Sequence, residues 1–262
     1  MSSRKALLIG INYIGSSNAL NGCVNDILNV KNFLTTEFAM KEEEIVMLNE
    51  ANPSLMPTRA NILKYIAWLV KDAKPSSRLF LHYSGHGTNI ADTSGDENDH
   101  RDECIVPVDY DSAGFIVDDE LRKCLIDVLP AGCQLFTIFD CCHSGTMFDL
   151  KYNYLFKSTD QFNTYQVILE KHVKDTACNV TMLSGCLDDQ TSADAYINRK
   201  PQGAMTYSFL AAYRRLRGAG KRMTCQNLMK ILHLYINEGQ YTQFPKMSTG
   251  KLINLNTPIS FM

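Results

Sequence analysis

The sequence predicts an α/β protein with a mostly parallel central sheet flanked by helices. Short apolar runs typical of buried strands alternate with longer segments of helical periodicity. Several of these runs are hydrophobic at nearly every position, as strands covered on both faces are. Two of them are followed directly by polar, reactive residues, and open α/β sheets keep their chemistry at such strand ends.

The first part of the chain repeats a strand and a helix. Residues 6–11 predict the first strand, and 24–38 the helix that follows it. The pair recurs as a strand over 45–48 and a helix over 58–70, and the next strand covers 78–84. These are βαβ units, which join parallel strands.

The second part continues the alternation less regularly. A polar, acidic stretch covers 88–111, and a helix begins at Asp118, where acidic side chains suit the helix dipole. A strand then ends at Asp140, and the polar segment 151–176 predicts a long surface loop with a helix inside it. The remaining expected elements are strands over 179–184 and 245–254 and helices over 207–217 and 225–235.

Length and composition indicate one globular domain over residues 1–262. Hydrophobic residues make up 45% and charged residues 21%, and the net charge of -2 gives no basic excess for binding nucleic acid. No run approaches the 18 apolar residues of a membrane span. The nine cysteines are odd in number and several lie in apolar runs, which favours a reducing compartment and a cytoplasmic protein.

Two short motifs carry the candidate chemistry. HYSGHG occupies positions 82–87 and DCCHSG positions 140–145, each after an apolar strand. A nucleophilic cysteine needs a partner that takes its proton, and histidine is the usual one. With the histidine first and the cysteine about 50 residues later, the order is that of a cysteine-nucleophile protease. Cys142 is therefore the candidate nucleophile, and His86, between two glycines, the candidate base.

Two other histidines are rivals for the role of base. His82 lies inside the strand and points to one of its faces, with Phe80 and Ser84. His143 adjoins the cysteine in sequence and is expected to project away from it. His86 remains the favoured base.

With these motifs the chain resembles the metacaspases, caspase-fold proteases of protists, fungi and plants. Four more segments look like family blocks in the family's order: GINY at 10–13, NGCVND at 21–26, PTRAN at 57–61 and SGCLDDQTSA at 184–193. The resemblance implies a caspase-like three-layer sandwich. It also implies a p20-like part over 1–150, a connecting segment over 151–176 and a p10-like part over 177–262. Many metacaspases carry an N-terminal prodomain, but none is expected here, because the first predicted strand begins almost at once.

The resemblance assigns roles to individual residues. It makes Cys142 the nucleophile and His86 the general base, with the N–H groups of Gly87 and Cys142 as the oxyanion hole.

Metacaspases cut after arginine or lysine, and their basic-residue pocket corresponds here to Cys23, Asp26, Ser84 and Asp140. From the residues alone, the favoured roles are instead a helix start for Asp26 and a turn for Asp140. Because two carboxylates beside a cysteine disfavour its thiolate, we expect bound arginine to help activate it.

Acidic residues cluster strongly between positions 92 and 120. Eleven acidic side chains and a single arginine lie there, which suits either a solvated loop or a calcium site. The spacing is not that of an EF-hand. The resemblance implies calcium activation, with the ligands Asp102, Asp118, Asp119 and Asp149.

Other functions fit the sequence less well. A cysteine phosphatase needs an arginine where Phe148 stands, residues 218–221 fail the P-loop pattern, and no paired Cys-x-x-Cys spacing suggests structural zinc. A caspase-fold scaffold that binds without turnover is the main alternative. As a protease the chain is expected to act on peptides or proteins as a monomer. The expected sites of autocleavage are Lys151, Lys157, Lys171 and Lys174.

Overall fold

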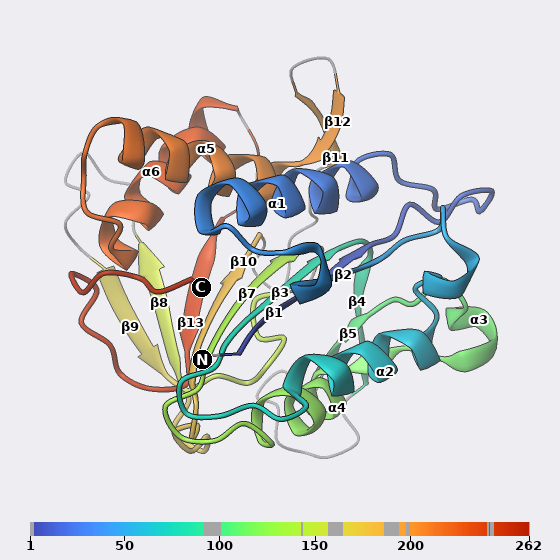
Figure 1. Cartoon of the computed structure of the whole chain (residues 1–262), viewed down its shortest axis with the longest axis horizontal. Coiled ribbons are helices and arrows are strands. Elements are labelled where there is room, and N and C mark those ends of the chain that lie inside the picture. The colour runs from blue at the N-terminus through green and yellow to red at the C-terminus, as the bar shows by residue number, and fades with distance from the viewer. Residues whose placement is uncertain are drawn as a thin grey trace.

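The molecule has three layers, with helices on both faces of one eight-stranded sheet (Figure 1). This confirms the predicted α/β class with a mostly parallel sheet flanked by helices. The computed structural model describes residues 3–91, 101–142, 144–156, 165–185, 194–197, 200–239, 241 and 244–261.

The strands of the central sheet lie in the order β2-β1-β3-β7-β10-β13-β8-β9. The first five are parallel, and β13, β8 and β9 run antiparallel to their neighbours. In chain order the strands are β1 (Arg4–Gly10), β2 (Ile45–Leu48), β3 (Arg78–Ser84), β7 (Gln134–Asp140), β8 (Tyr152–Phe156), β9 (Tyr165–Leu169), β10 (Asn179–Ser184) and β13 (Lys246–Thr249).

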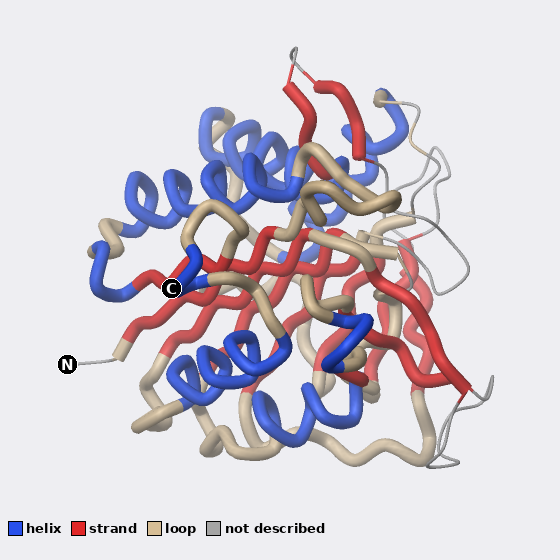
Figure 2. Tube along the Cα trace, turned by 90° about the vertical axis from the view of Figure 1, so that its right-hand side faces the viewer, coloured by secondary structure: helices blue, strands red, loops and turns tan. Residues whose placement is uncertain are grey.

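Helices cover both faces of this sheet, as the turned view shows (Figure 2). One face carries α1 (Cys23–Phe38), α5 (Ala204–Gly218) and α6 (Cys225–Glu238). The other carries α2 (Arg59–Val70) and α4 (Asp118–Leu121), which continues into a π-turn, η3 (Arg122–Ile126). Three short helices complete the described set: η1 (Glu42–Glu44), η2 (Pro53–Leu55) and α3 (Tyr110–Ala113).

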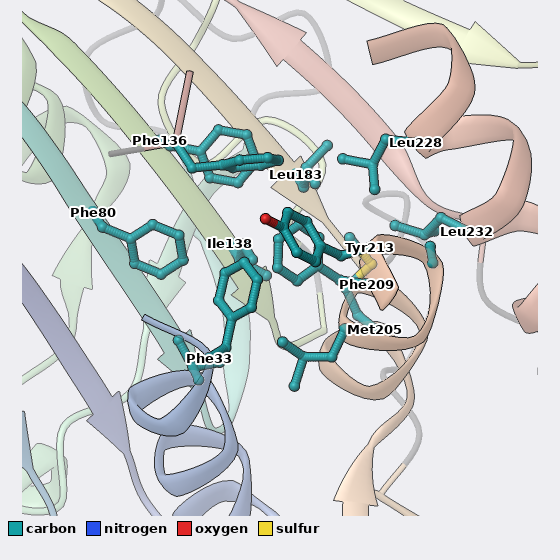
Figure 3. Close-up of a cluster of buried hydrophobic side chains, with 14 of the residues drawn as sticks. Phe33, Phe80, Phe136, Ile138, Leu183, Met205, Phe209, Tyr213, Leu228 and Leu232 are labelled. Atoms are coloured by element: carbon teal, nitrogen blue, oxygen red, sulfur yellow. The ribbon is translucent and has the colours of Figure 1, made fainter. Parts of the chain in front are cut away.

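The sheet separates two hydrophobic cores, because alternate residues of each strand face opposite sides. In β3, Phe80 belongs to the core under α1, α5 and α6, whereas Leu81 and Tyr83 belong to the core under α2. The first core is rich in aromatic rings that meet edge to face (Figure 3). The ring of Phe33 lies 5.6 Å from that of Phe209 and 4.7 Å from that of Tyr213.

The expectation of a loop with a helix over residues 151–176 is wrong. Of its described residues, 152–156 and 165–169 form β8 and β9, which extend the sheet as an antiparallel pair, and 170–176 form no regular element. Tyr152, Tyr154 and Phe156 alternate with smaller residues, and Tyr154 is fully buried. The four lysines lie outside both strands, but they made the segment as a whole look polar.

The acidic stretch over 88–111 also holds strands that we did not predict. A small antiparallel sheet consists of β4 (Gly87–Ala91), β5 (Arg101–Ile105) and β6 (Ile116–Val117). Two acidic residues of β5, Asp102 and Glu103, are buried, so charge does not mark solvent exposure here. A further hairpin, β11 (Asp194–Ile197) with β12 (Lys200–Gly203), leads directly into α5.

None of the described helices is both long and apolar enough to cross a membrane.

Candidate active site

The two reactive motifs lie together at one edge of the central sheet. Strands β3 and β7 pair in parallel register, with Ser84 opposite Asp140. His86 follows Ser84 by two residues, and Cys142 follows Asp140 by two. Neighbouring parallel strands end at the same edge, so this equal offset carries both residues to the same place.

Gly87 shows how closely the two turns approach. A Cβ atom on Gly87 would collide with the carbonyl oxygen of Cys142, and it would lie 3.2 Å from the sulfur of Cys141. Glycine is therefore required here by space. Cys142 is half-buried, whereas Cys141 is completely buried and packs in the core under α2.

The imidazole of His86 is held by the loop after β1, residues 11–22. Its Nε2 lies 2.6 Å from the carbonyl oxygen of Asn18, and its ring lies 4.6 Å from the ring of Tyr13. The main-chain N–H of His86 also donates to the Tyr13 hydroxyl, at 3.0 Å. A carbonyl oxygen only accepts, so Nε2 carries the proton and Nδ1 is the basic nitrogen of the neutral ring.

The Gly87 N–H is suitably placed for an oxyanion hole. Gly87 pairs with Ile105 of β5, and the N–H of Val106 donates to the carbonyl of His86. This pattern puts Gly87 at a non-hydrogen-bonded position of the antiparallel pair, so its N–H points away from β5.

Of the two rival histidines, the structure describes His82, which is not placed as an alternative base. His82 is completely buried inside β3, and its Nε2 lies 2.9 Å from the hydroxyl of Thr206. Burial lowers the pKa of His82 to about 3, so it cannot accept a proton near neutral pH. His143 lies outside the described residues.

Three of the four predicted pocket residues converge next to the motifs. The Ser84 hydroxyl donates to Asp26, at 2.7 Å, and Ser84 lies opposite Asp140 in the sheet. Asp26 and Asp140 both border Gly203, where an added Cβ would collide with Asp140 and lie 2.7 Å from Asp26. Cys23, the fourth, lies one turn before Asp26 at the start of α1 and is buried.

The N-terminus of α5 holds both of these carboxylates. The N–H of Gly203, the residue that precedes the helix, donates to both oxygens of Asp26 at 3.0 Å. The N–H of Thr206, in the first turn, donates to Asp140 at 2.7 Å. These N–H groups have no partner within the helix, and the helix dipole favours negative charge there. These hydrogen bonds favour the charged form of both carboxylates, which lie side by side in the interior.

Three of the four predicted calcium ligands, Asp102, Asp118 and Asp149, lie close enough for their negative charges to repel one another. Asp118 is buried, and its pKa is raised to about 7 by desolvation and by the negative charges of Asp149 and Asp102. Its carboxylate accepts the N–H of Glu103, at 2.9 Å, and that of Asp119. The chemistry of this buried acidic group suits a hard cation.

Among the described residues, however, these side chains do not form a coordination sphere. Asp119 forms an ion pair with Lys123, at 3.0 Å. Within the described part of the chain, no three acidic, histidine or cysteine side chains lie close enough together to hold a metal ion. Four acidic residues of the stretch, between 92 and 100, lie outside it.

Comparison with known proteins identifies the family. Residues 4–151, more than half of the chain, match the profile described as metacaspase, peptidase C14 domain. The chain belongs to the metacaspase family. It is thus a cysteine-type endopeptidase by family, and both His86 and Cys142 lie within the matched residues.

Curated relatives agree with this assignment. This metacaspase is 38% identical to Metacaspase-1 of Kluyveromyces lactis, over 97% of the chain and 67% of the relative. It is 37% identical to Metacaspase-1 of Cryptococcus neoformans, over 97% of the chain and 64% of the relative. Metacaspase-1 of Saccharomyces cerevisiae is also 37% identical, over 97% of the chain and 68% of the relative. The chain therefore spans about two thirds of the length of these relatives.

A solved structure shares the fold. The crystal structure of protein GSU0716 from Geobacter sulfurreducens superposes with a TM-score of 0.65 at 23% identity, covering 96% of this chain and 95% of that one.

Several residues of the metacaspase site were not predicted from its sequence. Gly203 and Thr206 bind the pocket carboxylates, although they follow Asp140 by more than 60 residues and no local pattern marks them. Glu50 accepts the N–H groups of Asn12 and Ile14, at 2.6 and 2.7 Å. Glu50 could have been found, because it follows β2 by two residues, at the same sheet edge as the motifs.

Proposed function

We propose that this metacaspase is a calcium-dependent cysteine endopeptidase that cuts peptide bonds after arginine or lysine. The observation that carries the proposal is the pair of buried carboxylates, Asp26 and Asp140, beside the strand ends that bear His86 and Cys142. A buried guanidinium or ammonium group needs such carboxylates to offset its desolvation.

The proposed reaction uses the orientation of His86. Nδ1 takes the proton of the Cys142 thiol, and the thiolate attacks the carbonyl carbon of the scissile bond. The oxyanion that forms accepts hydrogen bonds from the N–H groups of Gly87 and Cys142. The imidazolium returns its proton to the leaving amine, and a thioester remains on Cys142. Water, deprotonated by the same imidazole, then hydrolyses the thioester and releases the acid product.

We propose calcium as the activating ion, with Asp102, Asp118, Asp119 and Asp149 as its ligands. The support is the buried acidic group around Asp118, whose mutual repulsion a bound cation would relieve. Calcium would supply positive charge next to the segment that follows the nucleophile, since Asp149 lies seven residues after Cys142. Asp119 would have to exchange its partner Lys123 for the ion.

Autocleavage fits some of the predicted lysines better than others. Lys171 and Lys174 are exposed in the segment after β9. Lys151 is only partly exposed and pairs with Asp175, at 2.9 Å. Lys157 lies outside the described residues. We therefore propose Lys171 and Lys174 as the favoured sites.

A peptide-cleavage assay tests the proposed function. Fluorogenic peptides ending in arginine, lysine, aspartate or norleucine are compared, each with added calcium and with excess chelator. We expect turnover of the arginine and lysine peptides only, and only with calcium. Replacing Cys142→Ala should abolish turnover, whereas the buried neighbour variant Cys141→Ser should retain it. Activity that persists in chelator would remove the calcium proposal, and a chain inactive on every peptide would favour the scaffold alternative.

A further inference from the structure

A buried chain of hydrogen bonds lies behind the pocket carboxylates. It starts at His82 on β3, passes through Thr206 on α5 and ends at Asp140 on β7. His82 Nε2 lies 2.9 Å from Thr206 Oγ1, which lies 2.8 Å from Asp140 Oδ2. Their exposed fractions are 0%, 1% and 3%, so solvent does not compete with these bonds.

The direction of each bond follows from counting protons. An ionised carboxylate only accepts, so the single hydroxyl proton of Thr206 goes to Asp140. Thr206 Oγ1 can then only accept from His82, which requires the proton on Nε2. Nδ1 of His82 is left without a proton and, among the described residues, without a hydrogen-bond partner. Burial keeps the ring neutral, so His82 is a permanent donor to Thr206.

The consequence of this chain is a fixed carboxylate. Both donors of Thr206, its N–H and its hydroxyl, meet the same oxygen of Asp140, Oδ2. The other oxygen, Oδ1, lies on the side of Gly185, 3.5 Å from where a Cβ of that residue would stand. Two hydrogen bonds to one oxygen set the rotation of the carboxylate and therefore the direction in which Oδ1 points.

We propose that Thr206 and His82 are positioning residues for substrate specificity. They do not touch the substrate; they hold Asp140 so that its second oxygen meets the guanidinium or ammonium group of the residue before the cleaved bond. The inference rests on the proposed function, since it gives Asp140 its role in the pocket.

Paired variants of Thr206 test the proposal by kinetics. Thr206→Val keeps the shape and the main-chain N–H but loses the hydroxyl, whereas Thr206→Ser keeps the hydroxyl. With arginine peptides we expect Thr206→Val to raise KM about ten-fold while kcat changes by less than about two-fold, since a charge-assisted bond is lost outside the reacting atoms. Thr206→Ser should restore most of the affinity.

Thr137→Val is the matched control. Thr137 is equally buried, on β7, and among the described residues its hydroxyl has no hydrogen-bond partner. The same loss of a buried hydroxyl should leave KM unchanged there. Equal KM values for Thr206→Val and Thr206→Ser would overturn the proposal. If the wild-type chain itself shows no preference for arginine or lysine, the proposed function fails instead.

The role of His82 has a direct readout in nitrogen NMR of the Cys142→Ala protein. We expect a ring protonated at Nε2 only, with no titration between about pH 5.5 and 8. His82→Gln, which can still donate, should keep more of the arginine affinity than His82→Met, which cannot. A ring protonated at Nδ1, or one that titrates in this range, contradicts the assigned chain of bonds.

Discussion

Single residues decide how tightly the catalytic edge is assembled, and Gly87 is the most sensitive of them. An added methyl group would meet main-chain atoms of Cys142, and backbone cannot move aside as a flexible side chain can. The same residue is expected to donate its N–H to the oxyanion.

Gly87→Ala is therefore expected to reduce kcat by about 100-fold or more, because it separates the two turns and displaces an oxyanion donor. The measurement is turnover of an arginine peptide by folded protein. Gly218→Ala is the control: nothing lies within 4 Å of that added methyl group, at the end of α5, and activity should not change. Full activity in Gly87→Ala would mean that the two turns are not coupled as described.

Among elements, the loop after β1 has the clearest effect on the site. It supplies the carbonyl of Asn18 and the ring and hydroxyl of Tyr13 to His86. Tyr13 itself adopts a positive φ of 51°, an unusual conformation for a large residue. Glu50, from the segment after β2, holds this strained part of the loop through two main-chain N–H groups.

Replacing Glu50→Gln should loosen the loop. A glutamine has one accepting oxygen, and its amide N–H₂ would face an N–H donor of Asn12 or Ile14. We expect kcat to fall about ten-fold with little change in KM, because His86 is misaligned while the pocket is intact. Glu43→Gln, on an exposed side chain, is the matched control. A change confined to KM would place the effect of Glu50 in substrate binding instead.

At the scale of the whole molecule, two buried histidines make stability depend on pH. Burial lowers the pKa of His82 to about 3 and that of His233 to about 4. In the unfolded chain both titrate near their ordinary value of about 6.5. As the pH falls from about 6.5 toward 4, the unfolded chain therefore takes up protons that the folded chain refuses, and the free energy of unfolding decreases.

Each histidine should lower the free energy of unfolding by about 2 kcal/mol as the pH falls from 7 to 5. Chemical denaturation of the Cys142→Ala protein, which cannot digest itself, measures this. His233→Phe should lose its share of the pH dependence, since a phenyl ring suits the contacts with Phe156 and Phe244. Identical pH profiles in the parent and in His233→Phe would show that His233 does not stay neutral in the folded chain.

The sequence by itself determined the class of fold and predicted where the candidate site lies. Apolar runs marked the parallel strands, and the motifs after two of them located Cys142 and His86, because strand ends of a parallel sheet share one edge. It failed for β8 and β9, where the lysines before and after the strands made the segment look polar, and for the acidic strand β5, whose carboxylates are buried.

Only the tertiary structure decided how each group is held. The donors on Asp26 and Asp140 come from the start of α5, far along the chain, and the proton positions on His82 and His86 depend on partners from other elements. Asp119, an expected calcium ligand, forms an ion pair with Lys123 one helical turn away, a contact that its own position did not reveal. Strand patterns are local and can be read from neighbouring residues, whereas hydrogen-bond partners and the pKa values they set arise between segments that meet only when the chain folds.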